Sequence, residues 1–221
     1  MVSLAADRHG RTSRLGAVSW MVQVKKSEVR EAIFEAAALL FEQKGYVGTS
    51  ISEIGQTAGV TPSVIYVYFK SKLHLFSAVF APWLKARLDR LDRDIEDVAG
   101  YRNKVCRIVE TIWETIPCES NFFANNLMQA VSTATTTDFY SGELLEYCER
   151  RVAGMLAAAC PKKQRTGRDF DALAHILFMG FNGFVAGAYL GVRAEKARPA
   201  IVAMTDLIVG APAATLKVVS D

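Results

Sequence analysis

The side chains with the clearest chemical pattern lie between positions 50 and 72. Ser50 stands three residues before Glu53, a spacing at which each side chain bonds the backbone amide of the other and starts a helix. The residues that we assign to one binding surface are Ser50, Thr61, Pro62, Ser63, Tyr66, Val67, Tyr68 and Lys72. Small and polar groups suit base edges in a major groove, and lysine suits phosphate. The pattern favours binding of double-stranded DNA.

Constellations for catalysis and for metal binding are missing from the sequence. It contains no nucleophile elbow, no phosphate-binding loop and no pair of histidines at metal-binding spacing. The four cysteines form no C-x-x-C pair; they are Cys106, Cys118, Cys148 and Cys160. We therefore expect a protein that is not an enzyme, that uses no cofactor or metal, and whose cysteines stay reduced in the cytoplasm.

Composition and charge agree with this interpretation. Of the 221 residues 51% are hydrophobic and 22% are charged, which is enough apolar material to bury a core. The net charge is +3, and residues 1–72 hold 9 Lys/Arg against 6 Asp/Glu, whereas residues 73–221 hold 17 of each. A polyanionic partner should therefore meet the first third of the chain.

Helices must position these side chains. Apolar residues at intervals of three and four predict an amphipathic helix over about 26–44. Two short helices follow over 51–58 and 62–69, joined at Gly59, which can adopt the positive φ of a tight turn. Two short helices that are joined by a glycine turn and braced by a longer helix make a helix-turn-helix.

The remainder of the chain also has the pattern of helices. One helix is predicted over about 73–95, passing Pro82, and the others are predicted over 101–116, 119–134, 139–160, 169–191 and 196–209. No segment shows the sustained alternation of apolar and polar residues that is typical of strands. The sequence therefore predicts an all-α fold.

Three segments give the N-terminal part a family resemblance. They read Thr49-Ser50-Ile51-x-Glu53-Ile54, Ala58-Gly59-Val60 and Ile65-Tyr66-x-Tyr68-Phe69-Lys70-Ser71-Lys72. Over about residues 26–80 the chain resembles the DNA-binding domain of the TetR/AcrR family of transcriptional repressors. The resemblance implies an extension without regular structure over 1–24, a three-helix helix-turn-helix DNA-binding domain over 25–72, and a C-terminal helical ligand-binding and dimerisation domain over 73–221.

The resemblance also implies roles on DNA. The residues expected to face bases are Ser63, Tyr66 and Val67, and those expected to hold phosphates are Ser50, Tyr68 and Lys72. The family often has histidine where this chain has Val67, and a valine can contact only a thymine methyl group. The operator sequence of a relative is therefore not transferable to this chain.

A ligand cavity in the C-terminal domain is a further implication. Residues 100–160 are rich in large apolar side chains, which serve as core or as the wall of a mostly apolar pocket. The predicted lining is Trp113, Phe122, Phe123, Asn126, Phe139 and Tyr147. We expect an apolar or amphipathic effector, a change in Trp113 fluorescence when it binds, and the helix from Leu73 as the only lever between cavity and DNA.

An uncharged stretch covers residues 172–192 and is long enough to cross a bilayer. Gly183, Gly187 and Gly191 are four residues apart, which suits close helix packing in a membrane or in a soluble dimer. We favour a dimer, formed as a four-helix bundle across a two-fold axis. The predicted interface residues are His175, Phe178, Gly180, Gly183 and Gly187.

These observations favour a cytoplasmic, homodimeric transcriptional repressor. It would bind a pseudo-palindromic DNA operator and leave it when a small-molecule effector binds. Two alternatives stay open on the sequence alone. One is a DNA-binding regulator without a small-molecule effector, and the other is a membrane-associated helical protein in which the N-terminal motif is incidental.

Overall fold

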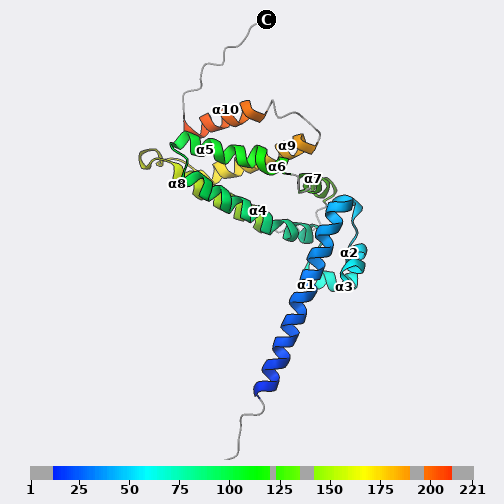
Figure 1. The fold of residues 1–221 in the computed structure, drawn as a ribbon. Coiled ribbons are helices and arrows are strands. Elements are labelled where there is room, and N and C mark those ends of the chain that lie inside the picture. Colours follow the sequence, from blue (N-terminus) through cyan, green and yellow to red (C-terminus); the bar gives the residue numbers. More distant parts are fainter. Residues whose placement is uncertain (1–11, 120–122, 135–141, 190–196, 211–221) are drawn as a thin grey trace, which may run out of the picture.

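The computed structural model describes residues 12–119, 123–134, 142–189 and 197–210, and all regular structure in these ranges is helical (Figure 1). The predicted all-α fold is confirmed. The helices are α1 (Thr12–Gly48), α2 (Ile51–Ala58), α3 (Pro62–Tyr68), α4 (Lys72–Glu96), α5 (Tyr101–Glu110), α6 (Ile116–Cys118), α7 (Phe123–Thr133), α8 (Glu143–Ala159), α9 (Phe170–Tyr189) and α10 (Ala197–Val209). A π-helical turn, Thr111–Thr115, joins α5 to α6, and a 3₁₀ turn, Lys162–Gln164, follows α8.

The first helix is longer than the sequence predicted. It begins at Thr12 rather than near Lys26, so residues 12–24, which we expected to lack regular structure, are helical and project away from the rest of the molecule (Figure 1). No proline interrupts this stretch, so the helix of residues 26–44 can continue backwards through it. At the other end Gly45 breaks the helical dihedral angles with a φ of 73°, directly after the predicted helix of residues 26–44.

The first three helices form the head of the molecule. Gly59 takes the left-handed conformation, with a φ of 68°, and turns the chain from α2 into α3. Ile54 of α2, Ile65 of α3 and Phe69 are fully or almost fully buried, and they belong to the same core as Phe41 of α1. The helix-turn-helix is therefore held by apolar packing against the C-terminal part of α1.

The fourth helix connects the head to the body, which comprises α4 to α10 (Figure 1). α4 is continuous through Pro82. Near its start the Phe76 ring lies 5.8 Å from the Phe41 ring and 5.6 Å from the Tyr46 ring, both in the head. Farther along, Leu84 and Leu88 are buried in the body. One helix thus contributes to the cores of both parts.

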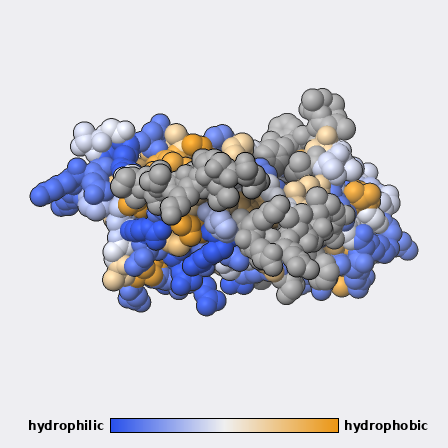
Figure 2. Space-filling view, turned by 90° about the horizontal axis from the view of Figure 1, so that it is seen from above, coloured by the Kyte–Doolittle hydropathy of each residue, from blue (hydrophilic) through white to orange (hydrophobic). Residues whose placement is uncertain are grey.

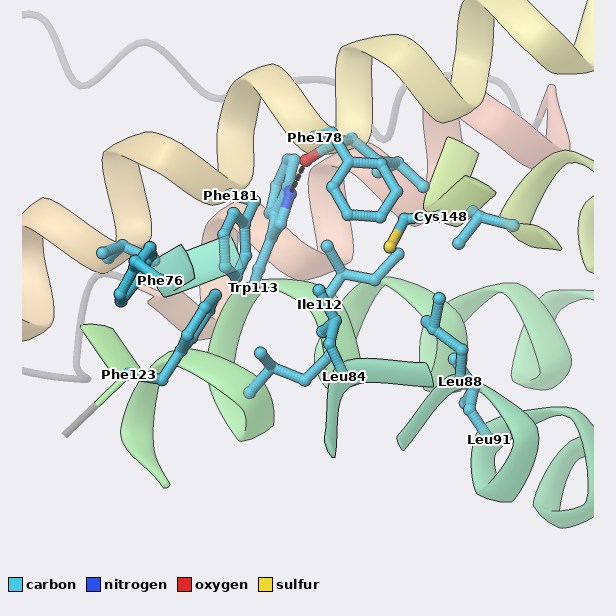
Figure 3. Packing of buried hydrophobic residues seen from close by; sticks show 14 of the residues in the cluster. Phe76, Leu84, Leu88, Leu91, Ile112, Trp113, Phe123, Cys148, Phe178 and Phe181 are labelled. Carbon is cyan, nitrogen blue, oxygen red and sulfur yellow. Dashed lines mark hydrogen bonds between the residues drawn. The ribbon is translucent and has the colours of Figure 1, made fainter. Parts of the chain in front are cut away.

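A tryptophan joins the π-helical turn to α9. The Trp113 Nε1 atom donates a hydrogen bond to the Leu177 carbonyl at 2.8 Å, and its ring stacks on Phe184 with 4.8 Å between centroids (Figure 3). Gly180 permits this approach, because a Cβ atom at that position would lie 2.6 Å from the indole ring. The contact fixes α9 against the π-helical turn between α5 and α6.

The uncharged helix anticipated from the sequence is α9. Residues Phe170–Gly187 have a mean hydropathy of 1.3, and 28% of them are buried in the structure. By length and composition this is the one helix among the described residues that matches a membrane span. It packs on α7, α8 and the π-helical turn, so one side of it belongs to the core of the body.

Candidate functional site

The recognition surface predicted from the sequence lies on α3. Val67 is 80% exposed and Tyr66 is 52% exposed, and Ser63 is exposed on the same short helix. Ile65, by contrast, is fully buried. The side chains at the start of α3, Thr61 and Pro62, are also exposed. The structure thus gathers five of the predicted DNA-binding residues on one solvent-facing surface, whereas Tyr68 is only partly exposed.

The capping box predicted at the start of α2 is confirmed. The Glu53 amide donates to the Ser50 hydroxyl at 3.1 Å, and the Ser50 amide donates to the Glu53 carboxylate at 2.9 Å. The Lys44 ammonium group donates to the same carboxylate at 2.7 Å. These hydrogen bonds, that of Lys44 foremost, lower the pKa of Glu53 to about 2. Both members of the box therefore act inside the head, where they fix the start of the helix-turn-helix.

Lys72 is bound to the end of α1 in the structure. Its ammonium group donates to the backbone carbonyls of Tyr46 at 2.9 Å and Thr49 at 3.0 Å, and it lies 4.2 Å from the centre of the Tyr46 ring. The sequence predicted a phosphate contact for this residue and missed this internal role. Carbonyls at a helix C-terminus attract cations, but the pairing of residue 72 with residues 46 and 49 is visible only once α1 and α4 are placed.

Replacing Lys72 by methionine should lower the free energy of unfolding by about 2 kcal/mol, since hydrogen bonds from a charged donor are lost. The exposed Lys70, replaced in the same way, is the matched control and should change that free energy by less than about 0.5 kcal/mol. Urea unfolding measures both values. Equal stability of the two variants would contradict the internal role of Lys72. The salt dependence of DNA binding tests the phosphate contact separately: if either variant lowers the slope by about one unit, the lysine that it lacks contacts a phosphate.

An apolar cavity of about 350 Å³ lies in the body, between α4, α7, α8 and α9. Its described lining consists of Leu73, Phe76, Ser77, Phe80, Leu84, Phe123, Leu127, Ala134, Leu144, Leu145, Cys148, Phe178, Phe181 and Asn182. None of these described residues carries a formal charge. Burial raises the pKa of the Cys148 thiol to about 12, so this wall also stays neutral at physiological pH. Such a cavity suits an uncharged apolar group.

The structure brings one of the predicted ligand residues, Phe123, to this cavity. Trp113 and Asn126 are buried elsewhere, Trp113 against α9 and Asn126 against the Phe41 carbonyl of α1. The Tyr147 ring lies under the Lys85 ammonium group, 4.8 Å away. The other two predicted lining residues, Phe122 and Phe139, fall outside the described residues.

Sequence reasoning missed the contribution of α4, which supplies more of the described lining than any other helix. Leu73, Phe76, Phe80 and Leu84 recur at intervals of three and four, which predicts a buried helix face but does not distinguish core from cavity wall. Trp83 also lies near the cavity, because its ring is 5.0 Å from the ring of Phe123, which lines it. Figure 3 shows Phe123 among the buried side chains around it. Trp83 rather than Trp113 is therefore the expected fluorescent reporter.

The residues predicted for a dimer interface fall into two groups. Phe178 and Gly180 face the interior, where Phe178 lines the cavity and Gly180 contacts Trp113. His175 and Gly183 are exposed, and Gly187 is partly exposed. No described atom lies within 4 Å of a Cβ built on Gly183. α9 thus has one side that packs in the body, with Phe178 and Gly180, and one side that faces solvent, with His175 and Gly183.

Large apolar side chains accompany Gly183 at the surface. Ile176 and Met179 of α9 are 47% and 49% exposed, and Leu207 of α10 is 73% exposed. Seen from the α10 side, the molecule shows apolar groups among hydrophilic ones at its surface (Figure 2). Large exposed apolar groups such as those on α9 are typical of an association surface.

An exposed helix in a helix-turn-helix, attached to a helical body with an internal apolar cavity, defines a DNA-binding regulator. Residues 33–79 match the family described as bacterial regulatory proteins, tetR family. These residues, which comprise the helix-turn-helix and the start of α4, have the DNA-binding domain of this family of regulators.

Individual relatives agree with this assignment. The fatty acid metabolism regulator protein of Bacillus subtilis is 26% identical over 89 residues, which are 40% of this chain and 46% of the relative. The chain thus aligns with less than half the length of this curated relative. The names of this relative and of the HTH-type transcriptional regulator AcrR of Shigella flexneri, 45% identical over 53 residues (24% of this chain and 25% of that protein), are those of regulators, in agreement with the prediction that the chain is not an enzyme.

Solved structures show the same fold over most of the chain. A TetR-family transcriptional regulator from Rhodococcus has a TM-score of 0.59 at 18% identity, and the match covers 83% of this chain and 99% of that one. The transcriptional regulator FadR from Bacillus subtilis, in complex with stearoyl-CoA, has a TM-score of 0.53 at 17% identity, with 82% and 96% covered. At these identities the likeness concerns the fold alone.

Proposed function

We propose that the protein is a transcriptional repressor that binds a pseudo-palindromic operator as a homodimer in the cytoplasm. An uncharged apolar molecule, or the apolar part of an amphipathic one, enters the cavity and releases the operator. The observation that carries this proposal is the double role of α4. Leu73 and Phe76 line the cavity, and the Phe76 ring also packs on Phe41 and Tyr46 of the head.

The surface of α3 supports the DNA-binding part of the proposal. Ser63, Tyr66 and Val67 are exposed together, and the second helix of a helix-turn-helix presents such side chains to the major groove. Ser63 and Tyr66 offer hydroxyl groups to base edges, whereas Val67 offers only methyl groups, which suit the methyl group of thymine. We therefore assign these three residues to base contacts.

The cavity supports the ligand class. Its described wall offers hydroxyl, amide and thiol groups only at Ser77, Asn182 and Cys148, so an ion placed there would lose its hydration without gaining an opposite charge. The likeness in fold to a regulator crystallised with stearoyl-CoA fits an acyl chain as one possible apolar part. On this proposal any charged group of the ligand stays outside the described part of the cavity.

The exposed side of α9 supports the homodimer. Ile176, Met179 and Gly183 lie at intervals of three and four along one face, and Gly183 leaves room for the backbone of a second helix. A two-fold axis through this face would pair α9 and α10 with those of a second copy. Such a dimer would present two α3 helices to successive turns of DNA, about 34–36 Å apart.

A probe titration tests the proposal. N-phenyl-1-naphthylamine is uncharged, and its fluorescence should rise when it enters the cavity. An operator duplex, selected from a randomised pool with the unaltered protein, should weaken probe binding by about 5- to 150-fold, and the probe should weaken operator binding by the same factor. Equal probe affinity with and without the duplex would contradict a ligand-driven release.

A matched pair of variants tests whether the probe binds in the cavity. Leu145→Trp fills the cavity from α8 and should abolish probe binding, whereas Glu143→Trp adds the same ring at an exposed position two residues earlier and should not. In the unaltered protein, Trp83 emission should change on probe binding, and Trp83→Phe should remove most of that change. Probe binding that survives Leu145→Trp would place the ligand elsewhere.

A further inference from the structure

One face of α7 lines the cavity, and the adjoining face contacts α1. Phe123 and Leu127, four residues apart, line the cavity. Asn126 and Gln129 lie on the adjoining face, and both contact α1. Since residues of a rigid helix move together, a displacement of the cavity face displaces the other face as well. α7 is therefore placed to sense the cavity and to act on the head.

The contacts of α7 are concentrated on what we call the α1–α2 corner, residues 40–50. The fully buried Asn126 donates its Nδ2 hydrogen to the Phe41 carbonyl at 3.1 Å. Gln129 accepts a hydrogen bond from the Val47 amide at 2.8 Å, and its side-chain amide fits over Gly45, where a Cβ atom would lie 2.8 Å from it. Two side chains of α7 thus hold the backbone on both sides of the break at Gly45.

The same corner is bound from α4. Lys72 donates to the carbonyls of Tyr46 and Thr49, and the Phe76 ring packs on Tyr46. The corner ends at Ser50, the N-cap of α2. Any rotation of the corner therefore passes directly into the helix-turn-helix, and the corner is gripped by two helices that each also line the cavity.

We infer that α7 is a second arm of the switch and that Asn126 and Gln129 transmit occupancy of the cavity to the α1–α2 corner. The inference rests on the proposed function, which it extends from one lever to two. A ligand between α4 and α7 changes the distance between the two helices. Because both hold the same short piece of backbone, that change turns the corner and moves α3 relative to the body.

The hydrogen bonds suit this role because they depend steeply on geometry. At 2.8 Å and 3.1 Å both bonds are within the normal range, and a shift of α7 by about 1 Å would take them out of it. The corner then has two discrete arrangements, one held by α7 and one released from it. Asn126 and Gln129 act as positioning residues and touch neither the DNA nor the cavity.

A double-mutant cycle tests the inference without requiring the natural ligand. Leu145→Trp stands in for an occupant and should weaken operator binding by about 5- to 150-fold in the unaltered background. Gln129→Met keeps the length of the side chain but removes the acceptor for the Val47 amide. In that background Leu145→Trp should weaken operator binding by about twofold or less, because the coupling is lost. Fluorescence anisotropy with the selected duplex measures all four affinities.

The controls separate coupling from stability. Gln129→Glu retains an acceptor oxygen and should restore the full effect of Leu145→Trp, whereas Ser132→Ala, on the exposed part of the same helix, should leave it unchanged. If Gln129→Met or Leu145→Trp fails to fold, Asn126→Leu and Leu144→Trp take their places. If Gln129 had a merely structural role, Gln129→Met would lower operator affinity equally with Leu145 and with Leu145→Trp. The factor by which Leu145→Trp weakens operator binding would then be the same with Gln129 as with Gln129→Met.

The outcomes distinguish the inference from the function on which it rests. If Leu145→Trp weakens operator binding by the same factor with Gln129 and with Gln129→Met, the role of α7 is overturned and the repressor proposal stands. A Leu145→Trp protein that no longer binds the probe but holds the operator as the unaltered protein does would overturn the cavity switch itself, and the inference with it.

Discussion

Replacing Val67 by glutamate should weaken operator binding by about a hundredfold or more, since a carboxylate on the recognition surface meets the negative potential of DNA at a cost of several kcal/mol. Val67 is 80% exposed, so the same change should alter the free energy of unfolding by less than about 0.5 kcal/mol. Fluorescence anisotropy at fixed salt measures the affinity, and urea unfolding measures the stability.

Val67→Gln is the matched control for this variant. It has the size of glutamate without the charge, so it should recover most of the lost affinity. If Val67→Glu binds the operator as well as the unaltered protein, α3 does not face the DNA and the recognition surface must be sought elsewhere on the head.

Replacing Gly183 by leucine should convert the dimer to a monomer at micromolar concentration. Gly183 is exposed on the apolar face of α9, and no described atom of its own chain lies near a Cβ built there. A leucine would therefore meet only the second copy, where a small-to-large change costs about 1–3 kcal/mol per copy. Operator affinity should fall with the dimer, because both half-sites must be bound together.

The control for Gly183→Leu is Gly154→Leu, since Gly154 of α8 is also an exposed helical glycine with open space around its Cβ position. Gly154→Leu should stay dimeric in sedimentation velocity. A Gly183→Leu protein that remains dimeric at nanomolar concentration would move the interface away from this face of α9.

The helix-turn-helix could be predicted almost to the residue because its signals are local. The Ser50–Glu53 box fixes the start of α2, and Gly59 fixes its end. Pro62, in the first turn of α3, favours the start of that helix, whereas the Thr61 side chain before it makes no capping hydrogen bond. Each signal acts within four residues of the chain, so a reader of the sequence needs no knowledge of the tertiary structure. The observed bounds of α2 and α3 agree with the prediction to within one residue.

The cavity could not be predicted in this way because its walls come from distant segments. Trp113 is a residue type that often contacts ligands. Its side chain, however, is held by a hydrogen bond to the Leu177 carbonyl and by the space that Gly180 leaves for the indole ring. Likewise Lys85 reaches Tyr147 from another helix. The periodicity of a helix says which side is buried and does not say whether the space beyond it is filled.

If α7 is a second arm of the switch, as we infer, the prediction of a single lever was incomplete for the same reason. α4 is continuous with the helix-turn-helix in sequence, so its role is visible there. The contacts of Asn126 with Phe41 and of Gln129 with Val47 join residues about eighty positions apart. The polar residue Asn126 in a largely apolar segment was the available signal, and we assigned it to the ligand rather than to the head.

On the proposed function, the uncharged character of the described cavity wall has a consequence for the response of the protein to salt. Binding of an uncharged ligand to a neutral cavity is insensitive to ionic strength, whereas operator binding weakens steeply as salt rises. Salt therefore acts on one of the two linked equilibria and leaves the other unchanged. In a cell that concentrates its cytoplasmic ions, less ligand would be needed to free the operator, and the genes under its control would respond to hyperosmotic stress without any change in the sensor.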